Sequence, residues 1–458
     1  MSHNLILKSD SYKLTHHRMY REGTEVVYSY LEARKGAEYD EVVFFGLQKI
    51  LETLEGEVIT AKDIREARAL CDVHIGPGVF NFEGWMHILE THQGRLPITI
   101  KALPEGTVVR PGVALLTIEN TDPECFWLTN FLESLILHVW YPITVASKSR
   151  AIKQDIKKAL DHVGADLGGL DFMLQDFGYR GATSDEAAAI GGAAHLVNFK
   201  GTDTLVALEL IQQTYGGGVE GFSVNASEHS IMTAGGREGE WDVLDNLIAQ
   251  YPTGILSIVA DSYNIYEHTR RLGGQYKDQI MARTDGPYVE RPDSTTPEHP
   301  TPEALVVWIV SQLWLDFGGE IVNDYRLLDP HIRVLWGDGI DREGIKKILW
   351  ALIDAGFSPL CVACFGMGGG LLQKVNRDDL KMAIKSSAQR RHGRWHDVYK
   401  EAPGKFSKRG RLKNVLEKDG IHTVQESNQA PDQLVEVFRN GEILIKHTFD
   451  GIRERAKI

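Results

Sequence analysis

The sequence has few of the features that mark secreted or membrane-spanning proteins. Its 458 residues include only four cysteines, too few for disulfide bonds to hold together a chain of this length. The longest apolar run, residues 304–315, is interrupted by Ser311 and Gln312 and is too short to cross a bilayer. The first residues, MSHNLILKSDSYKL, contain no apolar core of a signal peptide. We therefore expect a cytoplasmic protein.

An excess of basic charge is also missing. The chain has 50 lysines and arginines against 63 aspartates and glutamates, which gives a formal net charge of −13. General nucleic-acid binders need a positive surface that displaces counterions from phosphates, so the composition argues against that class. A local basic pocket for a phosphorylated small molecule remains compatible with this charge. The length predicts two or three domains of ordinary globular composition.

From about residue 170 onward, short apolar segments end in small or polar residues, and a helix-like stretch follows each of them. Such repeated strand-then-helix units predict an α/β fold with a parallel sheet. We favour an irregular α/β barrel over a doubly wound sheet, because no single glycine-rich first turn dominates. The seven segments are FMLQDFGYRG, LVNFKGTD, GFSVNASEHS, GILSIVADSYN, GPYVERPDS, IRVLWGDGID and PLCVACFGMGGG.

The regions on either side of these units have a different pattern. Short strands separated by turns occur in the first part, and a helical region around residues 123–160 is interrupted by Pro142. After residue 385 the chain is basic and loop-like, and it then returns to strands with a hairpin turn at Asn440-Gly441. We predict a β-rich domain from residues 1–150, completed by 386–458, around an α/β barrel formed by 151–385.

Several strand ends carry residues suited to phosphate, ribose or metal binding. The glycines of FGMGGG permit close approach of an anion to the backbone, and a tight turn that needs positive φ explains them equally well. Asp261, Asp293 and Asp338 follow three different strands, where they suit ribose hydroxyls or hydrated Mg²⁺, or cap the next helix. Arg291 lies on the same side of its strand as Asp293 and suits a phosphate.

Other motifs leave their role open. Asp203 in HLVNFKGTDT follows a predicted buried strand and a turn at residues 200–202, where a carboxylate caps a helix, holds a metal or reads a ligand. His229 lies beside Glu228, and a single histidine of this kind is more often structural. The CVAC sequence, residues 361–364, has redox spacing, but in a strand its cysteines face opposite sides, so we expect core packing without a disulfide.

With these residues gathered, the chain resembles the nicotinamide phosphoribosyltransferases, a family of type II phosphoribosyltransferases, over nearly its whole length. The resemblance implies an irregular α/β barrel with a discontinuous β-rich domain, and a homodimer with shared active sites. It also implies transfer of phosphoribose from phosphoribosyl pyrophosphate to nicotinamide with Mg²⁺, and ATP as a co-substrate. The motifs that carry it are DSYKLTHHRMY, NTDPECFWLTN, WYPITVASKSR, DFGYRG, HLVNFKGTDT, SEHS, ADSYNIY, RPDS, GDGID, GGGLLQK and SKRGRL.

The resemblance also implies roles for individual residues. Phe177 and Tyr12 correspond to the two rings that sandwich the pyridine, with Tyr12 supplied by the partner subunit. Arg180 belongs to the same pyridine site, and we expect Asp203 to read the carboxamide. His229 corresponds to a histidine that ATP phosphorylates.

The remaining implied positions surround the phosphoribosyl pyrophosphate. Catalytic roles fall to Asp261 and Asp293, which lie near the ribose hydroxyls and hold Mg²⁺ directly or through water, together with His229. The ribose and phosphate pocket is implied for Ser257, Arg291, Gly337, Asp338, Gly368, Gly369 and Arg377. The pyrophosphate end is implied for Arg34, Lys400 and Lys405.

Two other functions compete with this interpretation. A nicotinate phosphoribosyltransferase shares the architecture, and a non-catalytic sensor of pyridine nucleotides would share the ligand site. The presence of Asp261, Asp293 and the basic residues of the pyrophosphate end argues against a sensor.

The mechanism needs no general base, because the pyridine nitrogen carries a free lone pair and no proton.

Overall fold

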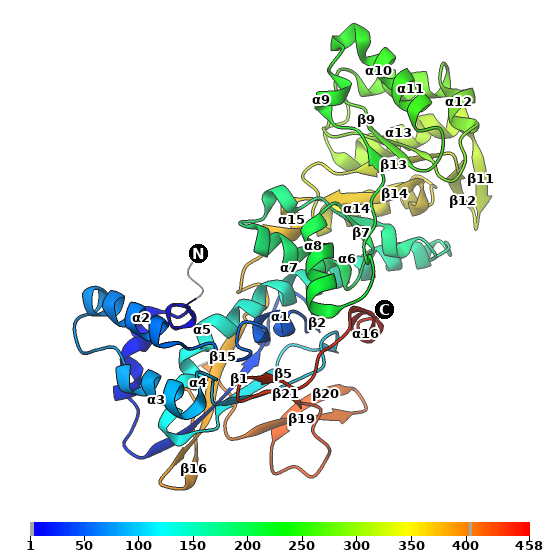
Figure 1. Ribbon diagram of the computed structural model, residues 1–458. Helices are drawn as coiled ribbons and strands as arrows, with labels where there is room; N and C mark the ends of the chain where they lie inside the picture. Colours follow the sequence, from blue (N-terminus) through cyan, green and yellow to red (C-terminus); the bar gives the residue numbers. More distant parts are fainter. Residues whose placement is uncertain (1–3, 403–404) are drawn as a thin grey trace. The chain divides into compact units, whose positions relative to one another are not determined.

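A computed structural model describes residues 4–402 and 405–458 of the chain (Figure 1). The chain forms two compact units. Unit 1 comprises Met1–Ser147, Gln213–Gly217 and Asn376–Lys457, and unit 2 comprises Lys148–Gln212 and Gly218–Val375. We expected domain limits at 150/151 and 385/386, and these limits stay a prediction. The units change over at 147/148, inside helix α6 (Trp140–His162), and at 375/376.

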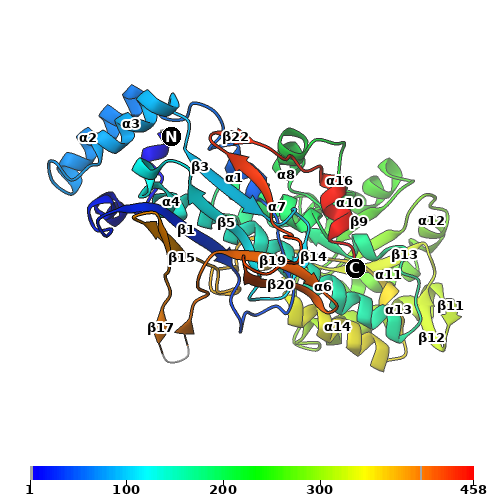
Figure 2. The ribbon, with the colours of Figure 1, turned by 90° about the horizontal axis from the view of Figure 1, so that it is seen from below.

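Unit 1 is built on a seven-stranded antiparallel sheet with the order β16-β15-β1-β5-β3-β21-β22. The late strands β15 and β21 pair with the early strands β1 and β3, which confirms that the tail packs onto the N-terminal strands (Figure 2). The strands are β1 (Thr24–Glu32), β3 (Ile98–Ala102), β5 (Ala114–Asn120), β15 (Ala383–Arg391), β16 (Arg394–Asp397), β21 (Val435–Arg439) and β22 (Glu442–Ile443).

Turn chemistry accounts for the hairpin that ends this sheet. Asn440 and Gly441 have φ values of 47° and 85°, the left-handed conformation that a two-residue hairpin turn requires. The predicted hairpin is therefore confirmed. Short paired strands complete the unit: β2 (Val42–Val43) with β4 (Val108–Val109), β17 (Glu401–Ala402) with β18 (Lys405–Phe406), and β19 (Leu412–Glu417) with β20 (Gly420–Gln425).

The helices of unit 1 include one correction. Pro142 is the third residue of α6 and does not interrupt the helix, because proline is tolerated in a first turn, where the backbone N–H groups have no intrahelical partner. The short segments before it are separate turns rather than one helix. The helices are η1 (Leu5–Leu7), η2 (Ser11–Arg18), α1 (Leu47–Leu51), α2 (Ala61–His74), α3 (Phe82–His92), η3 (Pro123–Cys125), α4 (Leu128–Phe131), α5 (Glu133–Ile136), η4 (Leu137–Val139) and α16 (Phe449–Arg455).

Unit 2 contains a seven-stranded parallel sheet with the order β7-β6-β14-β13-β10-β9-β8. The edge strand β7 bridges to Phe222, which precedes the strand of the opposite edge by three residues, so the sheet is curled. The α/β fold with an irregular barrel is confirmed. The strands are β6 (Leu174–Asp176), β7 (Gly201–Thr202), β8 (Asn225–Ala226), β9 (Leu256–Val259), β10 (Tyr288–Arg291), β13 (Ile332–Trp336) and β14 (Val362–Met367).

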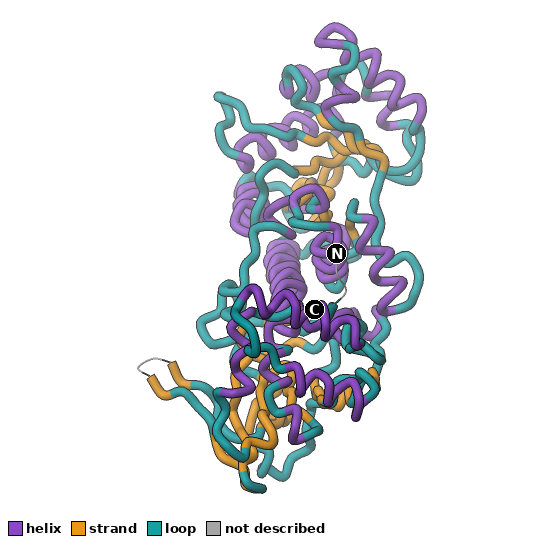
Figure 3. The backbone as a smooth tube through the Cα atoms, turned by 60° about the vertical axis from the view of Figure 1, so that its left-hand side comes forward, coloured by secondary structure: helices purple, strands orange, loops and turns teal. Residues whose placement is uncertain are grey.

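Helices follow the strands and surround them (Figure 3). An antiparallel hairpin, β11 (Gly319–Val322) and β12 (Tyr325–Leu328), interrupts the alternation. The helical segments of unit 2 after α6 are η5 (Leu170–Phe172), η6 (Tyr179–Gly181), α7 (Asp185–Leu196), α8 (Leu205–Leu210), η7 (Ile211–Tyr215, which ends in unit 1), α9 (His229–Met232), α10 (Gly236–Gln250), α11 (Ile265–Gly273), α12 (Lys277–Met281), α13 (Pro302–Phe317), α14 (Arg342–Asp354), η8 (Pro359–Cys361) and α15 (Gly369–Leu372).

One of the seven predicted strands lies elsewhere than expected. The apolar run Leu196–Phe199 is the buried end of α7 and the turn after it, and the strand β7 is Gly201–Thr202, which we expected to be a turn. The helix α7 is buried over most of its length, so its apolar residues show no helical periodicity and resemble a buried strand. Asp203 nevertheless follows a strand directly.

The cysteines of the CVAC segment behave as expected. Cys361 is buried in η8, Cys364 is half-buried in β14, and neither forms a disulfide. Within the part of the chain that the structure describes, no helix is both long and apolar enough to cross a membrane.

Candidate active site

The predicted site residues of unit 2 gather because every strand of the parallel sheet ends in at least one of them. The carboxyl ends of parallel strands meet at one edge of a barrel, which brings residues that are far apart in sequence into one region. In sheet order, these residues are Asp203 after β7, Phe177 and Arg180 after β6, Gly368 and Gly369 after β14, Gly337 and Asp338 after β13, Arg291 and Asp293 at the end of β10, Asp261 after β9 and His229 after β8.

Strand register places several of these side chains on the same face of the sheet. Paired residues of neighbouring strands point to the same side, and so do residues two positions apart. Val289 pairs with Ser257, and this places Arg291 on the same face as Ser257. Toward the β7 edge of the sheet, Gly366 pairs with Gln175, and Gln175 pairs with Gly201.

The Phe177 ring lies directly against the backbone of neighbouring strands. A Cβ atom on Gly366 would lie 2.1 Å from the ring, and one on Gly337 would lie 3.6 Å from it. The Phe177 N–H donates to the Met367 carbonyl at 3.0 Å. Because Gly366 and Gly337 have no side chains, their backbone forms a flat surface, the glycine bed, that fixes the Phe177 ring. The ring remains half-buried.

The same contacts explain the glycine-rich turn. Gly366, Gly368, Gly369 and Gly370 are not among the glycines with positive φ. Gly368 has a φ of −89° and a ψ of −109°, a combination outside the regions that other residues favour. Space is the reason at Gly370, because a Cβ on it would lie 2.8 Å from the Ile340 carbonyl oxygen. Positive φ is therefore excluded as the reason for these glycines, and anion binding by their backbone stays a prediction.

Gly366→Ala tests the glycine bed. The added methyl group must displace the Phe177 ring, so we expect KM for the aromatic substrate to rise and the free energy of unfolding to fall by about 1–3 kcal/mol, as overpacking does. Steady-state kinetics and denaturant unfolding measure the two effects. Gly169→Ala is the control, because no atom lies within 4 Å of its added Cβ. An unchanged KM in Gly366→Ala would show that the ring position is irrelevant to binding.

Three side chains from neighbouring strand ends form a hydrogen-bonded group. His229 Nε2 lies 3.0 Å from Asp261 Oδ1, and His229 Nδ1 lies 3.9 Å from Asp293 Oδ2. Ser294 donates to the other oxygen of Asp261 at 2.5 Å. Burial raises the pKa of Asp293, Arg291 lowers it, and the neighbouring Asp261 raises it again. Two carboxylates that repel each other in a partly dehydrated place are a suitable donor set for Mg²⁺.

Arg291 is placed among the acids. Its Nη2 donates to the Ser227 carbonyl at 2.5 Å. Burial lowers its pKa, and Asp293, Asp203 and Asp261 act in the opposite direction. The Arg291 Nε and the Ser257 Oγ are buried atoms for which no hydrogen-bond partner is found among the described residues.

Asp203 does not cap the helix that follows it. Helix α8 has Thr204 as its N-cap, without a side-chain capping bond. The Asp203 carboxylate is exposed, and its Oδ1 accepts from Gln175 Nε2 at 2.9 Å and from Ser223 Oγ at 2.5 Å. Its backbone N–H donates to the carbonyl of Asp176, a carboxylic acid whose pKa burial raises to about 6. The helix-cap role is therefore excluded in this structure.

The remaining positions of unit 2 lie on turns. Arg180 is exposed in η6. Asp338 is exposed in the turn after β13, where Trp336 Nε1 donates to its carbonyl at 2.8 Å and Gly339 has a φ of 56°. Gly368 and Gly369 begin the short helix α15.

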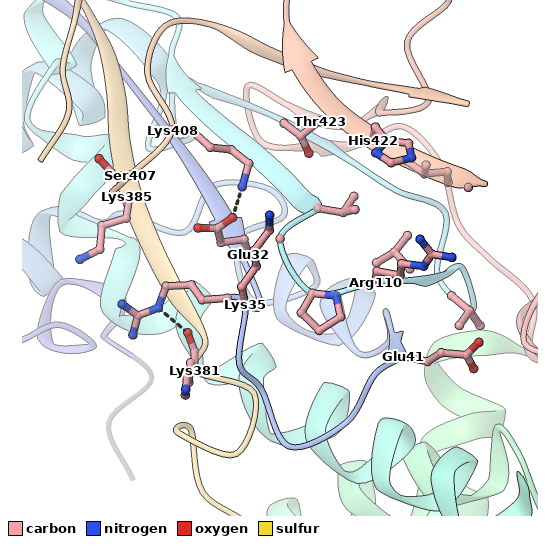
Figure 4. Close-up of a pocket in the computed structure, with 18 of the residues that line it drawn as sticks. Glu32, Lys35, Glu41, Arg110, Lys381, Lys385, Ser407, Lys408, His422 and Thr423 are labelled. Carbon is pink, nitrogen blue, oxygen red and sulfur yellow. Dashed lines mark hydrogen bonds and ion pairs between the residues drawn. The ribbon is translucent and has the colours of Figure 1, made fainter. Parts of the chain in front are cut away.

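In unit 1, two of the predicted basic residues line one cavity of about 1370 Å³ (Figure 4). Arg34 Nε donates to the Lys381 carbonyl at 2.8 Å, and the Lys400 backbone N–H bonds to Ser407. Seven basic residues face three acids in the lining, which gives the cavity a positive balance. These residues are Arg34, Lys35, Arg110, Lys381, Lys385, Lys400 and Lys408, with Glu32, Glu41 and Asp419.

Two other predicted positions of unit 1, Arg377 and Tyr12, are not among the described residues that line this cavity. Arg377 is exposed and pairs with Asp378 at 3.5 Å. Tyr12 lies in η2 with 59% of its surface exposed. Lys405 begins β18, and its side chain lies outside the described residues.

Sequence reasoning missed several residues of both regions. Gln175 and Ser223, which hold Asp203, carry no local signal, because their approach depends on which strands are neighbours. The cavity lysines Lys381, Lys385 and Lys408 lie in a stretch whose basic character was visible, but β1 and β15 had to pair before the cavity was evident. The FGMGGG motif indicated Gly366, but no feature of the sequence indicated that Gly366 accommodates the Phe177 ring.

Comparison with known protein families gives two matches. Residues 172–442 match the nicotinate phosphoribosyltransferase family. Residues 4–100 match the N-terminal domain of nicotinamide phosphoribosyltransferase.

Similar proteins cover almost the entire chain. A nicotinamide phosphoribosyltransferase of Xanthomonas campestris pv. campestris (strain 8004) is 42% identical over 99% of this chain and 98% of its own. One from Acinetobacter baylyi is 32% identical over 97% and 95%. The crystal structure of a nicotinate-nucleotide pyrophosphorylase from Pyrococcus furiosus has the same fold, with a TM-score of 0.63 at 16% identity over 99% of this chain and 94% of that one. The crystal structure of human nicotinic acid phosphoribosyltransferase has a TM-score of 0.57 at 13% identity, over 98% of this chain and 92% of that one.

Proposed function

We propose, since this chain belongs to the nicotinamide phosphoribosyltransferase family of type II phosphoribosyltransferases, that it joins nicotinamide to phosphoribosyl pyrophosphate in NAD biosynthesis. The bond between C1′ and the pyrophosphate oxygen breaks, and the pyridine nitrogen forms a bond to C1′. The products are nicotinamide mononucleotide and pyrophosphate. The observation that carries this proposal is the glycine bed of Phe177, because it presents a fixed aromatic face at the carboxyl edge of the barrel.

The pyridine is positioned by stacking and by its carboxamide. The Phe177 ring offers a flat surface for a second ring, and aromatic pairs of this kind gain about 0.5–1.5 kcal/mol beyond burial. Asp203 accepts a hydrogen bond from the carboxamide NH₂, and Arg180 lies after the same strand as Phe177. The gain in rate comes from holding the neutral nitrogen in line with C1′.

The departing pyrophosphate is stabilised by positive charge. Asp261 and Asp293 would hold Mg²⁺ through their carboxylate oxygens, directly or through water, and a cation there would supply positive charge for the leaving group. Arg291, with its partnerless Nε, binds phosphate or ribose oxygens beside Ser257. Gly337, Asp338, Gly368, Gly369 and Arg377 complete the proposed ribose and 5′-phosphate pocket.

The cavity of unit 1 is proposed to bind the pyrophosphate end. Its positive balance suits a polyanion, and Arg34 and Lys400, with Lys405 nearby in sequence, are the residues proposed for it. Arginine forks and lysine ammonium groups are the usual phosphate binders in proteins.

ATP is the proposed co-substrate, acting through His229. The Nε2–H of His229 donates to Asp261, which fixes the tautomer that leaves a lone pair on Nδ1. The γ-phosphoryl group passes from ATP to this nitrogen and ADP leaves. Hydrolysis of the phosphohistidine then drives product formation.

The active form is proposed to be a homodimer in the cytoplasm. The Tyr12 ring is exposed over more than half of its surface, and an exposed aromatic ring is suited to stacking in the site of a second copy. The shared site would then consist of Phe177 from one subunit and Tyr12 from its partner.

One assay tests the proposed function. The purified chain is incubated with phosphoribosyl pyrophosphate, Mg²⁺ and either nicotinamide or nicotinate, and the mononucleotide is identified by mass spectrometry. We expect nicotinamide mononucleotide, and the mass of the same preparation in solution should be that of a dimer. Formation of nicotinate mononucleotide alone would assign the competing activity, and no product with either base would contradict an enzyme.

A further inference from the structure

Two histidines, an aspartate and a cysteine meet in unit 1, and none of them is among the candidate active-site residues. His87 and His92 lie on α3, while Asp122 is the N-cap of η3 and Cys125 its last residue. One ligand atom from each of the four lies within 4.8 Å of the others. The segments are 30 residues apart in sequence, and the cluster exists because α3 packs against η3.

The side chains already converge on one carboxylate oxygen. Asp122 Oδ2 lies 2.7 Å from His87 Nε2 and 2.6 Å from His92 Nε2. Cys125 is fully buried beneath this group. The two histidine side chains are 31% and 26% exposed and Asp122 is 16% exposed, so the cluster opens to solvent on the histidine side.

The surroundings hold these side chains in place. Asp122 Oδ1 accepts from the Glu124 backbone N–H at 2.9 Å, and this leaves Oδ2 directed at the histidines. The Asp122 carbonyl accepts from Asn120 Nδ2 and from the Cys125 N–H. Thr91 Oγ1 lies 3.2 Å from His87 Nδ1. Once Nε2 binds a cation, the Nδ1–H group donates a hydrogen bond to this hydroxyl oxygen. Partners of this outer kind orient metal ligands in proteins.

We propose that His87, His92, Asp122 and Cys125 bind a zinc ion that fastens α3 to η3 and the end of β5. Two imidazoles, one thiolate and one carboxylate form a four-ligand set of the type that Zn²⁺ prefers. In tetrahedral zinc sites the ligand atoms lie roughly 3.3–3.8 Å apart, so shifts of about 1 Å convert the hydrogen-bonded cluster into a coordinated one. All four positions are protein ligands, which makes the site structural rather than catalytic.

The charges favour a cation here. A metal replaces the two hydrogen bonds of Asp122 by stronger contacts, and it binds the Cys125 sulfur as thiolate, releasing the thiol proton to solvent. The soft thiolate selects zinc over Mg²⁺ or Ca²⁺, which take oxygen ligands.

Zinc loading of the purified full-length chain tests this proposal. The protein is incubated with excess Zn²⁺, unbound metal is removed by gel filtration, and zinc is measured by elemental analysis. We expect one zinc per chain in the parent, retained in Cys71→Ser, which replaces another buried free cysteine on α2. His92→Ala and Cys125→Ser should lose it. Equal zinc content in the parent and in both variants would overturn the proposal.

Two further measurements keep the test decisive. If a variant fails to fold, Co²⁺ is bound to the parent chain, where a sulfur-to-cobalt charge-transfer band is expected and its absence overturns the Cys125 ligand. A second candidate group in the described chain consists of the exposed acids Glu417 and Asp419 with the half-buried His422, and it lacks a sulfur ligand. Loss of zinc in His422→Ala, with retention in His92→Ala, would assign the metal to that group and overturn ours.

Discussion

Replacing His229 with alanine is expected to abolish the stimulation of nicotinamide mononucleotide synthesis by ATP, so that the rate with ATP equals the rate without it. Synthesis itself should remain detectable, because in the proposed mechanism His229 acts only through ATP. The physical reason is the proposed nucleophile: a His229 ring that donates from Nε2 to Asp261, 3.0 Å away, keeps a lone pair on Nδ1 for the γ-phosphorus. Initial rates at saturating substrates, with and without ATP, measure the effect.

The control for this prediction is His396→Ala, which removes an exposed histidine on β16 of unit 1 and should leave ATP stimulation intact. Incubation with ATP labelled in the γ-phosphate adds a direct readout: the acid-labile label of a phosphohistidine should appear in the parent and in His396→Ala only. ATP stimulation that survives in His229→Ala would contradict the phosphohistidine.

The parallel sheet was largely predictable because its pattern is local. Each strand is a short apolar segment that ends in a polar or small residue, and six of the seven segments were placed at the observed strands. The seventh failed at Leu196–Phe199, where a helix buried on most sides has the same apolar composition as a buried strand. Local composition cannot distinguish a buried helix from a buried strand, because neither has a polar face toward solvent.

The site was predictable only in part, because its geometry depends on strand order and register. Asp261, Asp293 and Asp203 were found from their positions after strands. Their partners were not, since Ser223 reaches Asp203 only after the sheet curls toward Phe222. The turn after Asp293 depends on such contacts as well, because Thr296 accepts from the His299 backbone N–H at 3.0 Å and bonds to Tyr266.

The cation-rich cavity and the zinc cluster show the same limit. The cavity is lined from three separate stretches, around residues 32–41, 108–113 and 381–423, so no single motif predicts it. The zinc ligands come in two pairs without the CxxC spacing by which zinc sites are usually recognised. In both cases the folded chain, rather than the spacing in sequence, brings the groups together.

Asp203→Asn is expected to narrow the preference for nicotinamide over nicotinate. In the proposed complex, the Asp203 carboxylate accepts a hydrogen bond from the carboxamide NH₂, whereas nicotinate brings a second carboxylate to the same place. Asp203 is exposed in the free chain, and the like charges repel once the bound base displaces water from it. Leaving such a polar group unpaired costs about 1–3 kcal/mol, so the ratio of the two kcat/KM values should fall by roughly 5- to 150-fold.

The comparison is made by steady-state kinetics on both substrates in parallel. Asp203→Ser should narrow the preference as well, because it removes the charge and keeps a small polar group. Glu320→Gln is the matched control, since it neutralises an exposed carboxylate on β11 of the same unit and should leave the ratio unchanged. If Asp203→Asn and Asp203→Ser discriminate as strongly as the parent, Asp203 does not read the carboxamide. The specificity must then come from other groups at the carboxyl edge of the barrel, with Arg180 the first to replace.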